Sequence, residues 1–475
     1  MNVTARLFDA GEMVSRPSRR VALPRVVVSD DETTGVAGMA LWGEFLDHVN
    51  LVDEADRRQL RPIGPGGYTG GECLRALVEM VLAGGEFVSD RWLLAGEAND
   101  RLRGEHRLPS HVTLWRFLNG ADLGRVSKAA AVLRAMVARA WAMGAGPTGE
   151  WVTIDPDATT VDVFGDKEGA AYSYKGERAL SPMIGACGET GDVLGVRARG
   201  GNAEPGRAIA GFIRECVAAI PAAVREDKRL WARVDSAGYR DEVFATCEKL
   251  GAIFSVTAAM KPNVKAAIEA LATDAATVWE PALGAEHDRG SQIAQTTIVF
   301  QGRRRRANGT KTNAQPRTMR LIVRRQPVDA GDQLSLDDLG GWRFHAIVTN
   351  APADIAAVEV EQHHRLRGGI PENTIRRGKQ DFGMIHAPVS NFFGNWLWWL
   401  ADALALNVAR WIQILALPES FHRCRAKRLR HAFLNVAARI VRHARQLYLL
   451  LPRTYAHADA FIEALTRVRQ LPVYA

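Results

Sequence analysis

Four acidic residues in three sequence contexts are the candidates for chemistry in this chain. Asp155 and Asp157 lie two residues apart in "TIDPDAT", and Asp235 ends an apolar stretch in "RVDSAGY". Glu372 lies in "GGIPENTIRRGKQ". Carboxylates brought together repel one another unless a cation neutralises them, and oxygen ligands suit Mg²⁺ or Mn²⁺. A pair of such ions activates a water or a 3′-hydroxyl for in-line phosphoryl transfer.

Two strands and a helix must position these carboxylates. The alternation in "WVTIDPDATTVDVFG" predicts a strand on which Asp155 and Asp157 share a face, although Pro156 favours a strand edge or end. "RLWARVD" predicts a buried strand that Asp235 ends, and Glu372 follows a proline at a helix start. Each acid alone is more often a cap or a surface residue, and only the set favours a metal site.

Glu372 has a second interpretation, because basic residues surround it. An acid in the first turn of a helix complements the helix dipole and nearby cations, which is how most such glutamates act. The alternative is a metal ligand in a site that handles phosphates. The basic neighbours are Arg365, Arg367, Arg376, Arg377 and Lys379.

Composition indicates a folded protein of several domains with a polyanionic partner. The 475 residues are 47% hydrophobic and 24% charged, and 61 Lys and Arg outnumber 53 Asp and Glu to give a formal charge of +8. The five cysteines are scattered without a CxxC pair, so neither a disulfide framework nor a zinc site is predicted. A reducing cytoplasm fits this cysteine usage, and the opening residues lack an apolar run of signal-peptide length.

One long apolar stretch, from Phe392 to Leu417, is the only candidate for a membrane span. It carries Asn395, Asp402, Asn407 and Arg410, which would be costly in lipid. We therefore predict a largely buried core helix and no membrane association.

The N-terminal part of the chain is predicted to be helical. After a tail at 1–37, apolar residues recur with helical spacing over 38–148. Within this region "LPSHVTLWRFLNG" predicts a short helix that could read DNA, with Arg116 among its outward residues. A helical bundle without DNA contact explains the pattern nearly as well.

Strands and helices alternate over 149–260, which predicts an α/β layer, and a β-rich insertion follows at 261–351. The insertion carries a run of four arginines that suits a nucleic-acid backbone, although a solvated hairpin tip would read the same way. These are Arg303, Arg304, Arg305 and Arg306. Helices are predicted to resume at 352–417 and to continue through 418–475.

Three sequence blocks resemble the signature blocks of DDE transposases from bacterial insertion sequences, specifically the 1380 family. They are "IDPDATTVDVFGDKEGAAYSYKG", "RVDSAGY" and "RLRGGIPENTIRRGKQDFG". The resemblance implies an RNase H-like catalytic core, split into 149–260 and 352–417 around the insertion. It fits the spacing, because about 137 residues separate Asp235 from Glu372, far more than a loop needs.

The resemblance also implies a site. Its catalytic and metal-binding acids would be Asp157, Asp235 and Glu372, with Asp155 a rival for the first position and Mg²⁺ or Mn²⁺ as cofactor. Lys379, seven residues after Glu372, matches the lysine of the family's third block. Arg367 matches its arginine, although with one extra residue before Glu372, and His364 stands where the family has tyrosine. Lys379, Arg376 and Arg367 are expected to contact DNA.

The implied function is metal-dependent cleavage and strand transfer at the ends of an insertion sequence. The partners would be the terminal inverted repeats and target DNA, bound by a homodimer on paired ends in the bacterial cytoplasm at the nucleoid. Two alternatives stay open at this point. One is a metal-dependent DNA nuclease on the same fold, and the other is a non-catalytic DNA-binding protein derived from a transposase.

Overall fold

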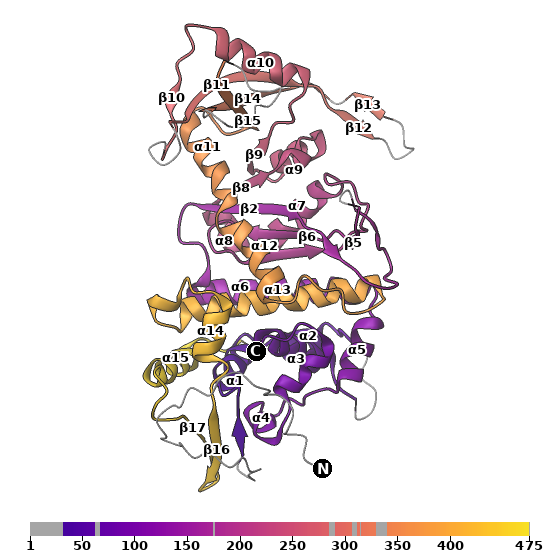
Figure 1. The fold of residues 1–475 in the computed structure, drawn as a ribbon, viewed down its shortest axis with the longest axis vertical. Helices are drawn as coiled ribbons and strands as arrows, with labels where there is room; N and C mark the ends of the chain where they lie inside the picture. Colours follow the sequence, from indigo (N-terminus) through magenta and orange to yellow (C-terminus); the bar gives the residue numbers. More distant parts are fainter. Residues whose placement is uncertain are drawn as a thin grey trace, which may run out of the picture.

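A computed structural model describes residues 32–61, 67–173, 176–284, 290–305, 311–313, 315–328 and 340–474. The molecule is elongated, with a helical region at one end and a large mixed sheet that runs through the middle to the other end (Figure 1). Helix α13 (Phe392–Leu415) crosses the molecule between these two parts. The mixed α/β class predicted from the sequence is confirmed.

The N-terminal region is helical, as predicted. Its longest helices are α3 and α6, and α3 begins with a capping box in which Thr69 and Glu72 exchange hydrogen bonds. Both helices pack against α13, so the region shares one core with the rest of the chain. Its elements are α1 (Met39–His48), α2 (Leu51–Arg57), α3 (Gly70–Leu82), η1 (Val88–Leu94), α4 (Glu97–Leu102), α5 (His111–Asn119), α6 (Leu123–Ala140) and η2 (Trp141–Ala145).

A nine-stranded sheet follows, in the order β10-β11-β14-β15-β9-β8-β2-β6-β7. Strand β2 is parallel to β8, and β8 is parallel to β9, whereas the other neighbours are antiparallel. The first five strands along the chain that belong to it are β2 (Trp151–Ala158), β6 (Met183–Cys187), β7 (Val193–Arg197), β8 (Arg229–Val234) and β9 (Ile253–Thr257). Short elements lie between them: β3 (Val161–Asp162), β4 (Ala171–Tyr172), β5 (Arg178–Leu180), α7 (Ile209–Ala219), α8 (Ala222–Asp227), η3 (Ser236–Gly238) and α9 (Asp241–Lys249).

The stretch 261–351 is rich in strands, as predicted, but it does not form a separate sheet. Strand β15 pairs with β9 from Ile347↔Thr257 to Thr349↔Ser255, so the stretch extends the central sheet. Without a neighbouring strand, the edge of β9 would leave backbone N–H and C=O groups without hydrogen-bond partners. Strand β15 supplies these partners. The stretch contains α10 (Pro262–Thr273), β10 (Glu280–Pro281), β11 (Gln292–Phe300), β12 (Arg303–Arg305), β13 (Lys311–Asn313), β14 (Arg317–Pro327) and β15 (Trp342–Thr349).

Helix α13 is buried along most of its length, in agreement with the predicted core helix. The side chain of Asn407 accepts a hydrogen bond from the Val193 amide at 2.7 Å and donates one to the Val193 carbonyl at 2.9 Å. Because β7 is the last strand of the sheet, the side-chain amide of Asn407 makes the two hydrogen bonds that a neighbouring strand would otherwise make. In the described part of the chain, no helix has the length and apolar character needed to cross a membrane.

The C-terminal region differs from the prediction of helices alone. A β-hairpin interrupts it, and β1 (Thr33–Thr34) pairs with the hairpin. The two turn residues, Ala444 and Arg445, both have positive φ, as a two-residue hairpin turn of type I′ requires, but they lack the Asn-Gly signature that marks such turns in a sequence. The elements are η6 (Glu419–Phe421), α14 (Ala426–Phe433), β16 (Ala438–His443), β17 (Gln446–Leu450) and α15 (Ala458–Gln470).

Replacing Asn407 by Leu should destabilise the fold by about 2–6 kcal/mol, because two buried backbone groups of Val193 lose their partners. Chemical denaturation of the purified variant measures this change. The exposed Asn263→Leu on α10 is the control, and it should stay within about 0.5 kcal/mol of the wild type. Equal stability of the two variants would show that Asn407 does not hold the sheet edge.

Candidate active site

The first two candidate acids lie level with each other on neighbouring parallel strands. Strands β2 and β8 pair from Trp151↔Arg229 to Ile154↔Ala232. Continuing this register by three residues sets Asp157 beside Asp235, on strands about 4.8 Å apart. The two acids therefore lie at the carboxyl ends of adjacent strands, Asp157 within the end of β2 and Asp235 one residue after β8.

Asp157 lies within electrostatic reach of both other acids. Burial raises the pKa of its carboxyl, and the negative charges of Asp235 and Glu372 raise it further, whereas Arg367 lowers it. The Arg367 guanidinium is 3.3 Å from Asp157 Oδ1, and the Ala158 amide donates to the same oxygen at 2.8 Å. Three carboxylates thus share one neighbourhood, with an arginine balancing part of their charge.

Glu372 reaches this neighbourhood from a third element. It lies in the first turn of α12 (Ile370–Asp381), which follows α11 (Ala357–Arg365) and η5 (Leu366–Gly368). The helix begins just after Gly369 and has a proline in its first turn, where no amide hydrogen is needed. Glu372 and Asp157 line one cavity of about 370 Å³, together with Asp155, Thr257, His345, His364, Arg365, Arg367, Gly368 and Ile375.

The carboxylates are near one another but do not enclose an ion as they stand. Among the described residues, no three Asp, Glu, His or Cys side chains are grouped closely enough to hold a metal. Asp235 Oδ1 accepts a hydrogen bond from the Ala237 amide at 3.1 Å, and Arg367 engages Asp157. The oxygen donors are of the type that Mg²⁺ or Mn²⁺ prefers, and side-chain rotation at these residues would have to close the site.

Asp155 has a different environment from Asp157, although both line the cavity. It is 1% exposed, and Arg233 holds both of its oxygens, with Nε–Oδ1 2.8 Å and Nη2–Oδ2 2.6 Å. The third nitrogen of Arg233 donates to the His363 carbonyl at 2.6 Å. Both oxygens of Asp155 are thus engaged by Arg233, and the geometry favours Asp157 as the first acid.

His364 forms part of the buried wall of the cavity. Its Nδ1 lies 2.9 Å from Ser255 Oγ and its Nε2 lies 3.1 Å from Thr257 Oγ1. Burial lowers the pKa of its imidazole to about 3, with smaller contributions from His345, Arg367 and Arg233. Burial also lowers the pKa of the neighbouring His363 to about 4. Both rings are therefore neutral in the folded protein near neutral pH.

The predicted DNA-contacting residues are not gathered in one place. Lys379 Nζ donates to Thr159 Oγ1 at 3.2 Å and to the Thr160 carbonyl at 2.9 Å, which fastens α12 to the segment after β2. Arg376 is exposed on α12, and Arg116 is exposed on α5. The arginine run begins in β12, where only the backbone of Arg303, Arg304 and Arg305 is described, and Arg306 lies outside the described residues.

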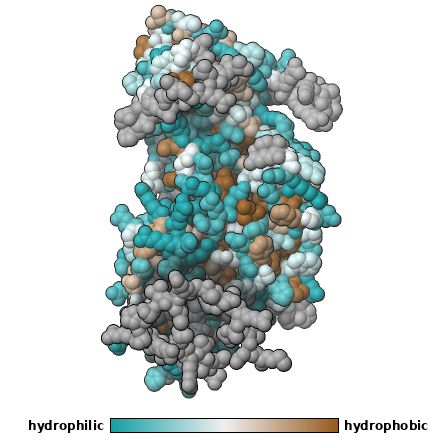
Figure 2. All heavy atoms as spheres, in the orientation of Figure 1, coloured by the Kyte–Doolittle hydropathy of each residue, from teal (hydrophilic) through white to brown (hydrophobic). Residues whose placement is uncertain are grey.

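A basic surface near α12 was not singled out from the sequence. Figure 2 shows a strongly hydrophilic patch over α12 and α14. The exposed basic residues of these elements and of the segment before α14 are Arg376, Arg423, Arg425, Lys427 and Arg428. Four of the five come from "RCRAKRLR" at 423–430, a local run of basic residues that could have been found from the sequence.

Comparison with known protein families matches the chain along most of its length. The family described as transposase DDE domain group 1 matches residues 58–473, which include Asp157, Asp235 and Glu372. This chain belongs to the DDE transposase family. Membership implies phosphoryl transfer on DNA, and the family usually uses a divalent metal. Assignment to the 1380 family and to a bacterium stays a prediction.

Structural comparison of the transposase gives a weaker likeness. It matches the cryo-EM structure of a piggyBac transposase synaptic complex with hairpin DNA at a TM-score of 0.39 and 9% identity, over 83% of this chain and 78% of that chain. No curated protein matches the sequence.

Replacing Asp155 by Asn should destabilise the protein by about 3–5 kcal/mol, because it leaves the buried charge of Arg233 without its partner. Asp157→Asn is the matched control, and it should change stability by less than about 1 kcal/mol because that carboxylate is part-exposed and has like-charged neighbours. Urea denaturation of both variants provides the comparison. A larger loss in Asp157→Asn would reverse the roles given to the two acids.

The neutral histidines predict a loss of stability in acid. Their folded pKa values lie below the ordinary 6.5, so the unfolded chain binds more protons, and stability falls as pH drops from about 6.5 toward 4. One such group contributes a slope of up to about 1.4 kcal/mol per pH unit. His364→Gln keeps a hydrogen-bonding side chain but takes up no proton. Thermal unfolding at a series of pH values should therefore show a stability that falls less steeply with decreasing pH in the variant than in the wild type. An unchanged slope would rule out His364 as a source.

Proposed function

We propose that this transposase cleaves DNA at the ends of an insertion sequence and joins the cut ends to a target. The observation that carries the proposal is that Asp157, Asp235 and Glu372 approach one another from β2, β8 and α12 within a chain of the DDE transposase family. We assign these acids as ligands of Mg²⁺ or Mn²⁺. The core around β2, β8 and β9 is then RNase H-like, with the first two acids at the carboxyl ends of parallel strands.

The chemistry needs an activated oxygen nucleophile and a stabilised leaving oxygen. Bound divalent ions would supply both effects, and the three carboxylates would hold them. Arg367 balances the charge of Asp157 in the metal-free protein. Its planar guanidinium could instead pair with a phosphate oxygen of bound DNA, since arginine suits phosphate as well as carboxylate.

The basic residues supply the DNA surface of the proposal. Arg376 lies one turn from Glu372 on α12, and the exposed cations at 423–428 extend the positive charge onto α14, within the hydrophilic patch of Figure 2. Such a surface binds the phosphate backbone without reading sequence. Recognition of the inverted repeats is assigned to the helical region at 38–148, with Arg116 on α5, and a homodimer would hold the two ends together.

Replacing Glu372 by Gln should abolish cleavage and joining while DNA binding is retained, because the change removes a ligand charge with little change in shape. The assay uses purified protein and DNA that carries the ends of the element, with Mg²⁺ or with chelator. Glu97→Gln is the matched control, since Glu97 is also an exposed acid in the first turn of a helix, α4. It should cost about 0.3–1 kcal/mol of stability and leave activity intact.

Three results would count against this proposal in different ways. Near-normal cleavage by Glu372→Gln would remove Glu372 from the metal site. Cleavage by the wild type in chelator would remove the metal mechanism. Cleavage without joining to any target would replace transposition by a nuclease activity.

A further inference from the structure

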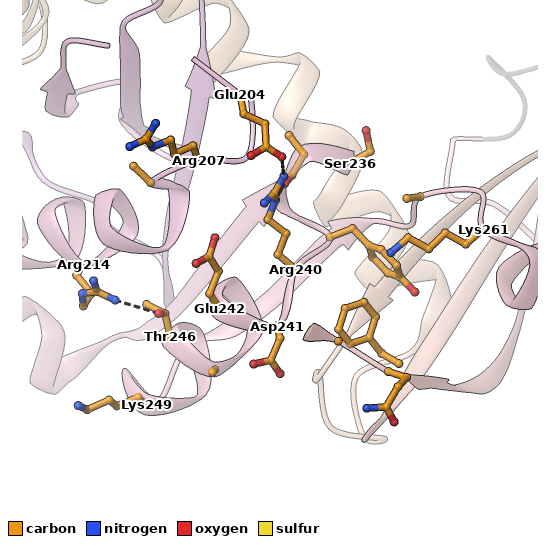
Figure 3. Close-up of a pocket in the computed structure, with 18 of the residues that line it drawn as sticks. Glu204, Arg207, Arg214, Ser236, Arg240, Asp241, Glu242, Thr246, Lys249 and Lys261 are labelled. Atoms are coloured by element: carbon orange, nitrogen blue, oxygen red, sulfur yellow. Dashed lines mark hydrogen bonds and ion pairs between the residues drawn. The ribbon is translucent and has the colours of Figure 1, made fainter. Parts of the chain in front are cut away.

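A second and larger cavity begins beside the candidate site. Its volume is about 1550 Å³, and Ser236, the residue after Asp235, lies in its wall (Figure 3). The other walls come from the start of α7, the outer face of α9, the segment before α10 and the end of β11. Pockets for drug-sized ligands occupy about 300–1,000 Å³, so this cavity suits part of a polymer better than a small molecule.

Positive charge in this cavity exceeds negative charge once ion pairs are considered. Glu204 pairs with Arg240, as Figure 3 shows, and Asp241 pairs with Arg317. The acid left in the wall is Glu242. In the described part of the chain, no carboxylate lies within ion-pair distance of the four other cations, which are Arg207, Arg214, Lys249 and Lys261.

These four cations come from different elements and surround the space. Arg207 precedes α7, Arg214 lies within α7, Lys249 ends α9, and Lys261 precedes α10 (Figure 3). Arg214 donates to Thr246 Oγ1 at 3.1 Å, and the Lys261 ammonium lies 5.1 Å from the centre of the Tyr239 ring. The four cations are spread along an extended path, which we call the track, rather than gathered around a single anion pocket.

Tyr239 gives a second and independent indication of a ligand. It lines the cavity and is 4% exposed, yet its hydroxyl has no hydrogen-bond partner among the described residues. A buried hydroxyl without a partner costs free energy, and such groups are rare in folded proteins. A phosphate oxygen in the cavity would satisfy it once the side chains that cover the hydroxyl move aside.

The far end of the cavity meets the arginine run. Gln301 and Gly302 lie in its wall, and β12 begins at the next residue, Arg303. The backbone therefore carries the basic segment 303–305 directly outward from the cavity, and the β12–β13 hairpin projects from the sheet (Figure 1). The track thus runs from Asp235 to the hairpin.

We propose that this cavity holds a stretch of DNA backbone that continues past the cut site toward the β12–β13 hairpin. The inference rests on the proposed function, because it takes the substrate to be DNA, and it assigns Arg207, Lys249 and the Tyr239 hydroxyl to phosphate contacts. Arg207 and Lys249 attract the phosphates through their charge, so the proposed binding does not depend on base sequence.

The test measures binding of a fluorescent DNA duplex of random sequence to the full chain, in chelator so that no cleavage occurs. Arg207→Gln/Lys249→Gln should weaken binding about tenfold and lower the slope of log K against log salt by about 2. The matched control is Arg442→Gln/Arg453→Gln, which removes two exposed positive charges at and beyond the β16–β17 hairpin. It should leave the slope unchanged.

Tyr239→Phe separates the cavity from general charge effects. The substitution removes only the partnerless hydroxyl, so the folded protein should be as stable as the wild type or more stable. Binding should nevertheless weaken severalfold with the salt slope unchanged. Unchanged binding by both Tyr239→Phe and the double variant would overturn the inference.

The failure of the inference is distinguishable from the failure of the proposed function. A wild-type protein that binds DNA and cleaves it, while the cavity variants bind equally well, contradicts only the track. A wild-type protein that binds no DNA contradicts both. Equal weakening of DNA binding by the cavity double variant and the control double variant would show an effect of net charge alone. That result would also contradict the inference.

Discussion

The ion pair between Asp155 and Arg233 is the interaction on which the site depends. It joins β2 to β8 at the residues that lie one strand repeat before the candidate acids, since Asp157 follows Asp155 by two and Asp235 follows Arg233 by two. Side chains two residues apart on a strand point to the same face, so the pair fixes which face both acids present. A shift of one residue in the pairing of β2 with β8 would turn one acid away from the other. It would also leave the buried charge of Arg233 without its partner.

The same arginine also positions the third acid. Arg233 Nη1 holds the carbonyl of His363, and the ring of His363 packs on Trp231 with ring centroids 4.3 Å apart. His363 lies in the last turn of α11, and only η5 and Gly369 separate α11 from the helix that carries Glu372. One side chain therefore connects two strands and a helix that are far apart in the sequence.

Local sequence patterns predicted the individual strands and the helix that carry the acids. How these elements pair depends on contacts between residues far apart in the sequence. The strand around Asp157, the strand ended by Asp235 and the helix of Glu372 follow from alternation, apolar runs and a proline at a helix start. Strand periodicity alone did not separate Asp155 from Asp157, because it places both on one face, and only the family resemblance favoured Asp157. The partner that distinguishes them, Arg233, lies in another strand. The same limit applies to the β-rich stretch, which the sequence predicted as an insertion without indicating its partner strand, since only the pairing of β15 with β9 shows that it extends the central sheet.

The order of the elements along the chain has a consequence for synthesis. Strands β2, β8 and β9 can pair soon after they are made, but Glu372 follows Asp235 by 137 residues, and the whole β10–β15 stretch comes in between. At typical rates of chain elongation this interval is roughly 7–27 s. The nascent protein thus carries two of its three acids for that time without the third. Under the proposed function, the acid set is therefore completed only after Arg116 on α5 and the basic segment 303–305 have been made, so these DNA-contacting regions precede the ability to cut DNA.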